Sequence, residues 1–64
     1  MKKKELKNLA KKIADAEFII QNSTDKKEVT KAQQDIMELS GKVNSVEDML
    51  ALDELVQEIL EQKS

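Results

Sequence analysis

The chain has 64 residues, enough for one domain over residues 1–64, and its formal net charge is −2. It contains no cysteine, histidine or arginine, which excludes disulfides, thiolate metal sites and imidazole-based catalysis. A domain this short buries only about 60% of the surface that its unfolded chain exposes, so its stability is marginal unless a disulfide, a metal or association with another chain adds to it. Of these three, association is the one that the sequence leaves open.

The first predicted helix covers about residues 3–21. Its apolar residues recur at spacings of three and four, which places them on one stripe of an α-helix; they are Leu6, Leu9, Ile13, Ala16 and Ile20. Residues 22–25, with the sequence Asn-Ser-Thr-Asp, all favour caps and turns. The helix should therefore end where they begin.

A second helix is predicted to follow Asp25. Glu28 lies three positions later, which is the spacing of a capping box. The apolar stripe of this helix consists of Val29, Ala32, Ile36 and Leu39. Gly41 is the only glycine in the chain, and its position predicts a left-handed residue that closes the helix.

A third helix is predicted over about residues 46–62. Ser45 stands at its N-cap position, with Asp48 in the first turn, where the helix dipole favours an acid. Because the two connections are short, neighbouring helices must be antiparallel, so the predicted fold is an all-α, up-down-up three-helix bundle. The alternative is a helical hairpin that completes its core by dimerising.

The third predicted helix carries more apolar surface than a small bundle needs. On a helical wheel its apolar residues cover about 220°, whereas the stripe of a surface helix covers about 100°. Asp53 falls inside this arc. In one interpretation the helix packs widely and Asp53 reaches water at its edge. In the other, Asp53 separates the core from a docking surface made of Val46, Leu50 and Leu60.

Phe18 is the only aromatic residue, and it lies about 160° from the centre of the first helix's stripe. Aromatic side chains are enriched in the cores of interfaces, which makes Phe18 a candidate interaction residue. Alternatively, the helix frays near Ile19 and Phe18 folds back over the end of the bundle.

The remaining residue types offer little chemistry. The four serines have no histidine to activate them, and a thin bundle leaves little room for a substrate pocket. One glycine cannot form a phosphate-binding loop. We therefore expect no enzymatic activity, no cofactor, no metal and no small-molecule substrate.

Charge is unevenly distributed, with +3 over residues 1–22 and −5 over residues 43–64. We expect the basic first helix and the acidic third helix to lie side by side. The leading functional prediction is a non-enzymatic protein–protein interaction or regulatory module that binds another chain or itself. The alternatives are nucleic-acid or ribosome binding through the N-terminal lysines, and weak association with a membrane surface through Phe18, Ile19 and these lysines.

The longest apolar run, residues 49–52, is too short for a signal peptide or a membrane span. We therefore expect a cytoplasmic protein. All 11 basic residues are lysine, which hints at an AT-rich bacterial or phage genome.

Overall fold

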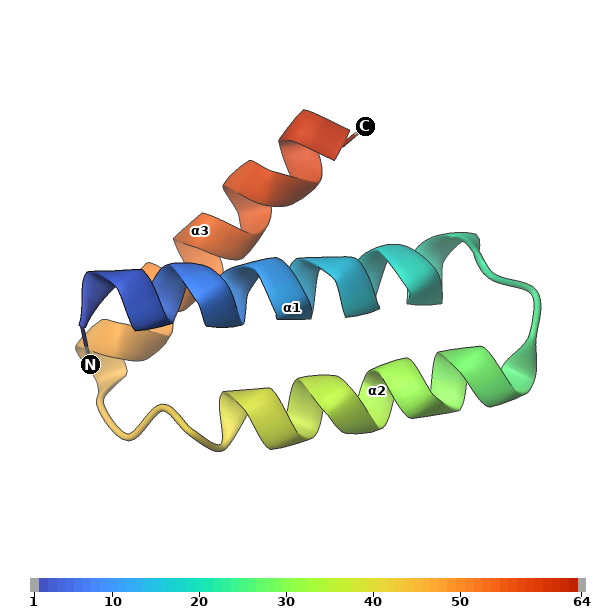
Figure 1. The fold of residues 1–64 in the computed structure, drawn as a ribbon, viewed down its shortest axis with the longest axis horizontal. Helices are drawn as coiled ribbons and strands as arrows, with labels where there is room; N and C mark the ends of the chain where they lie inside the picture. Colours follow the sequence, from blue (N-terminus) through green and yellow to red (C-terminus); the bar gives the residue numbers. More distant parts are fainter. Residues whose placement is uncertain (1, 64) are drawn as a thin grey trace.

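The computed structural model describes residues 2–63 and contains three helices in this part of the chain (Figure 1). They are α1 (Lys3–Asn22), α2 (Lys26–Ser40) and α3 (Val46–Lys63). The all-α three-helix prediction is confirmed, and the bounds differ from the expected ones by about a residue.

The connection between α1 and α2 is held by side-chain hydrogen bonds. The Asp25 carboxylate accepts the Lys27 N–H at 3.0 Å, as expected of an N-cap. Glu28 behaves differently from a capping-box residue, because its carboxylate accepts the Ser23 hydroxyl at 3.0 Å. The Ser23 oxygen in turn accepts the Asp25 N–H at 3.2 Å. Ser23, the first residue of the connection, is therefore hydrogen-bonded to Glu28 in the first turn of α2.

The prediction of a left-handed Gly41 is wrong. Its φ of −66° and ψ of −15° lie in the right-handed helical region. The turn continues beyond α2, since the Lys42 N–H donates to the Leu39 carbonyl and the Val43 N–H donates to the Ser40 carbonyl. The chain leaves α2 through a tightened last turn, which satisfies helix-end carbonyls without a left-handed residue.

The start of α3 is capped as predicted. The Ser45 hydroxyl accepts the Asp48 N–H at 3.1 Å, and the Ser45 carbonyl accepts the Met49 N–H. Val43, in the connection just before this cap, is buried and belongs to the core. The connection therefore also serves as a packing element between α2 and α3.

Helix α1 is the centre of the bundle. It packs against both α2 and α3, whereas α2 and α3 make only slight contact with each other. Figure 1 shows α2 antiparallel to α1, and α3 passing behind α1 and diverging from α2. The chain order is up-down-up, but α3 crosses α1 obliquely instead of lying alongside it.

The core lies where the helices cross. Its buried side chains are Leu6, Leu9, Ala10, Ile13, Ala14, Val43, Leu52 and Val56. Ala10 and Ala14 have no exposed surface. Ala14 lies about 40° around α1 from Phe18, and the Lys63 ammonium of α3 lies 5.6 Å from the centroid of the Phe18 ring. Small residues on the α3 side of α1 thus let the two helices approach closely, so oblique packing becomes possible. Ala16 and Ala32 are buried outside this cluster, on α1 and α2 respectively.

Candidate functional site

Exposed apolar side chains gather at the beginning of α3. Val46, Met49 and Leu50 are 73%, 53% and 63% exposed, while Leu52 in the same helix is 6% exposed. The first two turns of α3 therefore bury one side against α1 and leave a second apolar side in water. This second side is the surplus that the helical wheel predicted.

A groove lies next to this apolar surface, and we call it the α2–α3 groove. It has a volume of about 320 Å³ and receives residues from all three helices: Ile13 and Glu17 of α1, Ile36 and Ser40 of α2, and Met49, Leu50, Leu52, Asp53 and Val56 of α3. The groove lies where α3 diverges from α2.

The charges that line the α2–α3 groove are all acidic. Glu17 lies on α1 and Asp53 lies on α3, and the lining contains no lysine. Neither carboxylate has a hydrogen bond or an ion pair within residues 2–63. Glu17 is half-buried and Asp53 is exposed. The α2–α3 groove is therefore lined mainly by apolar residues and carries two unpaired carboxylates.

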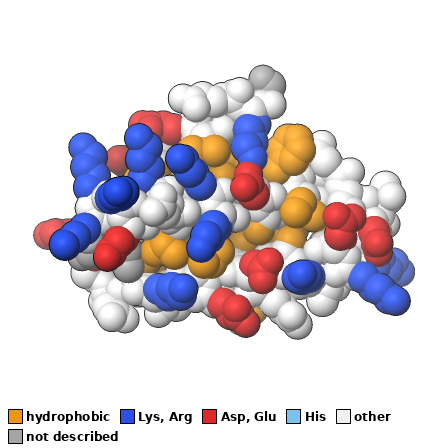
Figure 2. Space-filling view, viewed as in Figure 1, with side chains coloured by type: hydrophobic (Ala, Val, Ile, Leu, Met, Phe, Trp, Pro, Cys, Tyr) orange, Lys and Arg blue, Asp and Glu red, His pale blue; other side chains and the backbone are white. Residues whose placement is uncertain are grey.

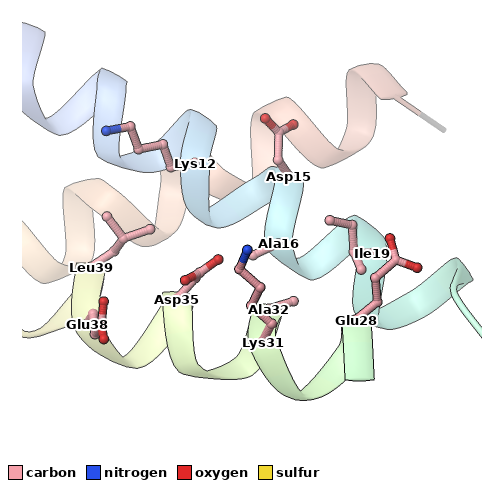
Figure 3. Close-up of a pocket in the computed structure, with 10 residues that line it drawn as sticks. All are labelled: Lys12, Asp15, Ala16, Ile19, Glu28, Lys31, Ala32, Asp35, Glu38 and Leu39. Atoms are coloured by element: carbon pink, nitrogen blue, oxygen red, sulfur yellow. The ribbon is translucent and has the colours of Figure 1, made fainter. Parts of the chain in front are cut away.

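A second groove, between α1 and α2, differs in character. It has a volume of about 500 Å³, and Figure 3 shows its lining residues projecting from the two helices. Lysine and acidic side chains are mixed there: Lys12 and Lys31 accompany Asp15, Glu28, Asp35 and Glu38. In Figure 2 the apolar strip on this face is bordered by side chains of both signs. The lining of the α1–α2 groove therefore carries both signs of charge, with two lysines among four acids.

Four of the five predicted interaction residues have clear positions relative to the α2–α3 groove. Leu50 and Asp53 line it. Val46 precedes Leu50 by one helical turn and extends the exposed apolar surface. Leu60 is only partly exposed and packs against the core cluster, so the exposed apolar group is Val46, Met49 and Leu50.

Phe18, the fifth, lies away from the groove. Fraying near Ile19 does not occur, since α1 continues to Asn22. The Phe18 ring lies 5.6 Å from the Lys63 ammonium, a cation–π arrangement. Lys63 also pairs with Asp15. These contacts fasten the last turn of α3 to α1, which gives Phe18 a structural contact within the bundle.

None of the groove residues on α1 and α2 was singled out as a site residue from the sequence. Ile13 and Ile36 belong to the expected core stripes of their helices, and Glu17 is an ordinary acid beside such a stripe. The sequence indicated on which side of its helix each of these residues lies. Whether those sides form a groove depends on the angle between α2 and α3. No signal in the sequence sets that angle directly.

The described residues were also compared with what a metal site or a membrane span would need. Over residues 2–63 no group of three acidic side chains is placed to hold a metal ion. Of the helices described, none is both long and apolar enough to cross a membrane. Comparison with protein families, curated proteins and solved structures found no match for this chain.

Proposed function

We propose that this protein is a non-enzymatic protein–protein interaction module that binds through the α2–α3 groove and the adjoining side chains Val46, Met49 and Leu50. The single observation that carries this proposal is the exposure of these three large apolar residues beside an apolar groove. Clustered exposed apolar surface is typical of interaction sites on small domains.

Burial of this surface by a partner is favourable on general grounds. Removing apolar surface from water contributes roughly 25 cal/mol per Å². The side chains lie on a helix whose first turn is capped by Ser45 and whose last turn contacts α1 through Lys63. A surface that is already ordered loses less conformational freedom on binding, so more of the burial energy appears as affinity.

The test is a matched pair of surface variants. Leu50→Gln removes an apolar side chain that lines the groove, and Met37→Gln removes one that is 75% exposed but lines neither groove. Each variant and the unaltered chain are immobilised, and proteins captured from the source cell extract are compared by quantitative mass spectrometry. We expect at least one protein to be retained by the unaltered chain and by Met37→Gln and to be lost from Leu50→Gln.

Sedimentation equilibrium over a concentration series tests whether the partner is a second copy of the chain. Association that disappears in Leu50→Gln and persists in Met37→Gln supports a second copy as the partner. If both variants capture the same proteins in the same amounts as the unaltered chain, and all three remain monomeric, the groove is not the binding surface.

A further inference from the structure

We infer that the α2–α3 groove accepts an amphipathic helix of a partner protein whose apolar stripe is flanked by lysine or arginine. This inference rests on the proposed function and specifies the partner. It is carried by two features of the groove: walls made of helices with few uncharged polar groups, and two unpaired carboxylates without any accompanying lysine.

The walls favour a helical occupant over an extended one. An extended peptide needs partners for its backbone N–H and C=O groups when it leaves water. The groove offers the Ser40 hydroxyl as its only uncharged polar side chain, and within residues 2–63 the protein has no strand edge to pair with. A helix satisfies its own backbone and needs only apolar contact, through residues at i, i+3, i+4 and i+7. Such a helix would touch α1, α2 and α3 together.

The charges favour a basic occupant. Glu17 of α1 and Asp53 of α3 both line the groove, so a helix placed there passes close to two negative charges. The chain has 11 lysines, yet none lines this groove, whereas two of them line the α1–α2 groove. Lysine and arginine also suit the rim of an apolar groove, because their stems cover apolar surface while the charge stays in water.

A second copy of the chain fits the groove less well. In a two-fold symmetric dimer the same surface meets itself, which would bring the carboxylates of both copies into one interface. The chain does have a lysine-rich helix, α1, but the apolar stripe of that helix is buried in its own core through Leu6, Leu9 and Ile13. It cannot present lysines and an apolar stripe to another molecule without unfolding.

The experiment uses three synthetic peptides of about 18 residues, long enough to form helix in water when rich in alanine. The first has leucines at i, i+3, i+4 and i+7 flanked by lysines. In the second the flanking lysines are replaced by glutamates, and the third is a scrambled form of the first. Binding to the full chain is measured by isothermal titration calorimetry at low and at high salt. We expect the lysine-flanked peptide to bind at low salt and the other two to bind at least tenfold more weakly.

Matched variants locate the site. The double variant Glu17→Gln, Asp53→Asn should weaken binding of the lysine-flanked peptide roughly five- to tenfold at low salt, with a smaller difference at high salt. Asp35→Asn removes a carboxylate from the α1–α2 groove and should leave the affinity unchanged. Circular dichroism of each variant confirms that the fold is retained. Equal binding of the lysine- and glutamate-flanked peptides, or equal effects of the two kinds of variant, would overturn the inference.

The outcome separates this inference from the proposed function. If no peptide binds, but capture of a cellular protein still depends on Leu50, the interaction surface stands and a basic helix is not its ligand. If the chain self-associates through Leu50, and the double variant associates more tightly, a second copy occupies the groove and the inference is wrong. If neither the peptides nor capture respond to Leu50→Gln, both proposals fail.

Discussion

Helices α1 and α3 have similar lengths and similar numbers of apolar residues, but they bury them differently. Helix α1 lies between two neighbours, and its buried side chains are Leu6, Leu9, Ala10, Ile13, Ala14 and Ala16. Helix α3 packs against α1 and makes only slight contact with α2, and its only buried residues are Leu52 and Val56. The position of a helix in the bundle, more than its apolar content, therefore decides how much of it is available to a partner.

This comparison predicts that the same substitution at two positions of α3 changes the free energy of unfolding by different amounts. Leu52→Ala removes a side chain that is 6% exposed and should lower the free energy of unfolding by about 2–4 kcal/mol. Leu50→Ala, two residues earlier and 63% exposed, should change it by less than about 0.5 kcal/mol. Urea unfolding followed by circular dichroism measures both. Similar losses for the two variants would show that Leu50 is covered in solution.

The close approach of α1 and α3 is tested by enlarging a side chain between them. Ala14 has no exposed surface, so Ala14→Leu should overpack the crossing and destabilise the protein by about 1–3 kcal/mol. Lys11→Leu, on an exposed position of the same helix, is the control and should have little effect on the free energy of unfolding. A stable Ala14→Leu variant would mean that α3 does not pack on this side of α1.

The start of α3 depends on its cap. Ser45→Ala removes the acceptor for the Asp48 N–H and should cost about 1 kcal/mol in the free energy of unfolding. Ser45→Asp keeps an acceptor at the same position and should retain most of the stability. Thermal unfolding of both variants measures the difference. An unchanged midpoint for Ser45→Ala would show that the cap does not contribute to stability.

The smallest effect is expected at Gly41, with the opposite sign. Its backbone is right-handed, and an added Cβ would meet only the Glu38 and Met37 carbonyl oxygens at 3.5 Å, an ordinary contact. Gly41→Ala should therefore stabilise the protein by about 0.4–1 kcal/mol, because alanine loses less freedom on folding. A loss of stability in the same urea experiment would indicate that Gly41 is left-handed in solution.

The sequence predicted the position of each helix, which depends on residues close together in the chain, but not every detail of the helix ends. The stripe from Leu6 to Ile20 and the caps at Asp25 and Ser45 predicted the helices to within about a residue. Gly41 was misread because a glycine at a helix end is compatible with both hands of the backbone, and the chain continued in the right-handed one. Val43 was not recognised as core because a single apolar residue in a connection has no periodicity.

The candidate site was predictable only in part. The surplus apolar arc of α3 identified Leu50 and Asp53, which line the groove, and Val46, which extends the apolar surface beside it. Leu60 shares that arc but lies nearer the α1 contact, where it packs against the core. A helical wheel gives the direction of a side chain around one helix, and it does not say how far the neighbouring helix extends.

Periodicity and capping, which act between residues close in the chain, determined three amphipathic helices joined by two short connections. The oblique crossing of α3 over α1 and its divergence from α2 appear only in the folded chain, because that angle depends on how whole helix surfaces pack on small residues such as Ala10 and Ala14. The apolar groove with its two carboxylates follows from that angle.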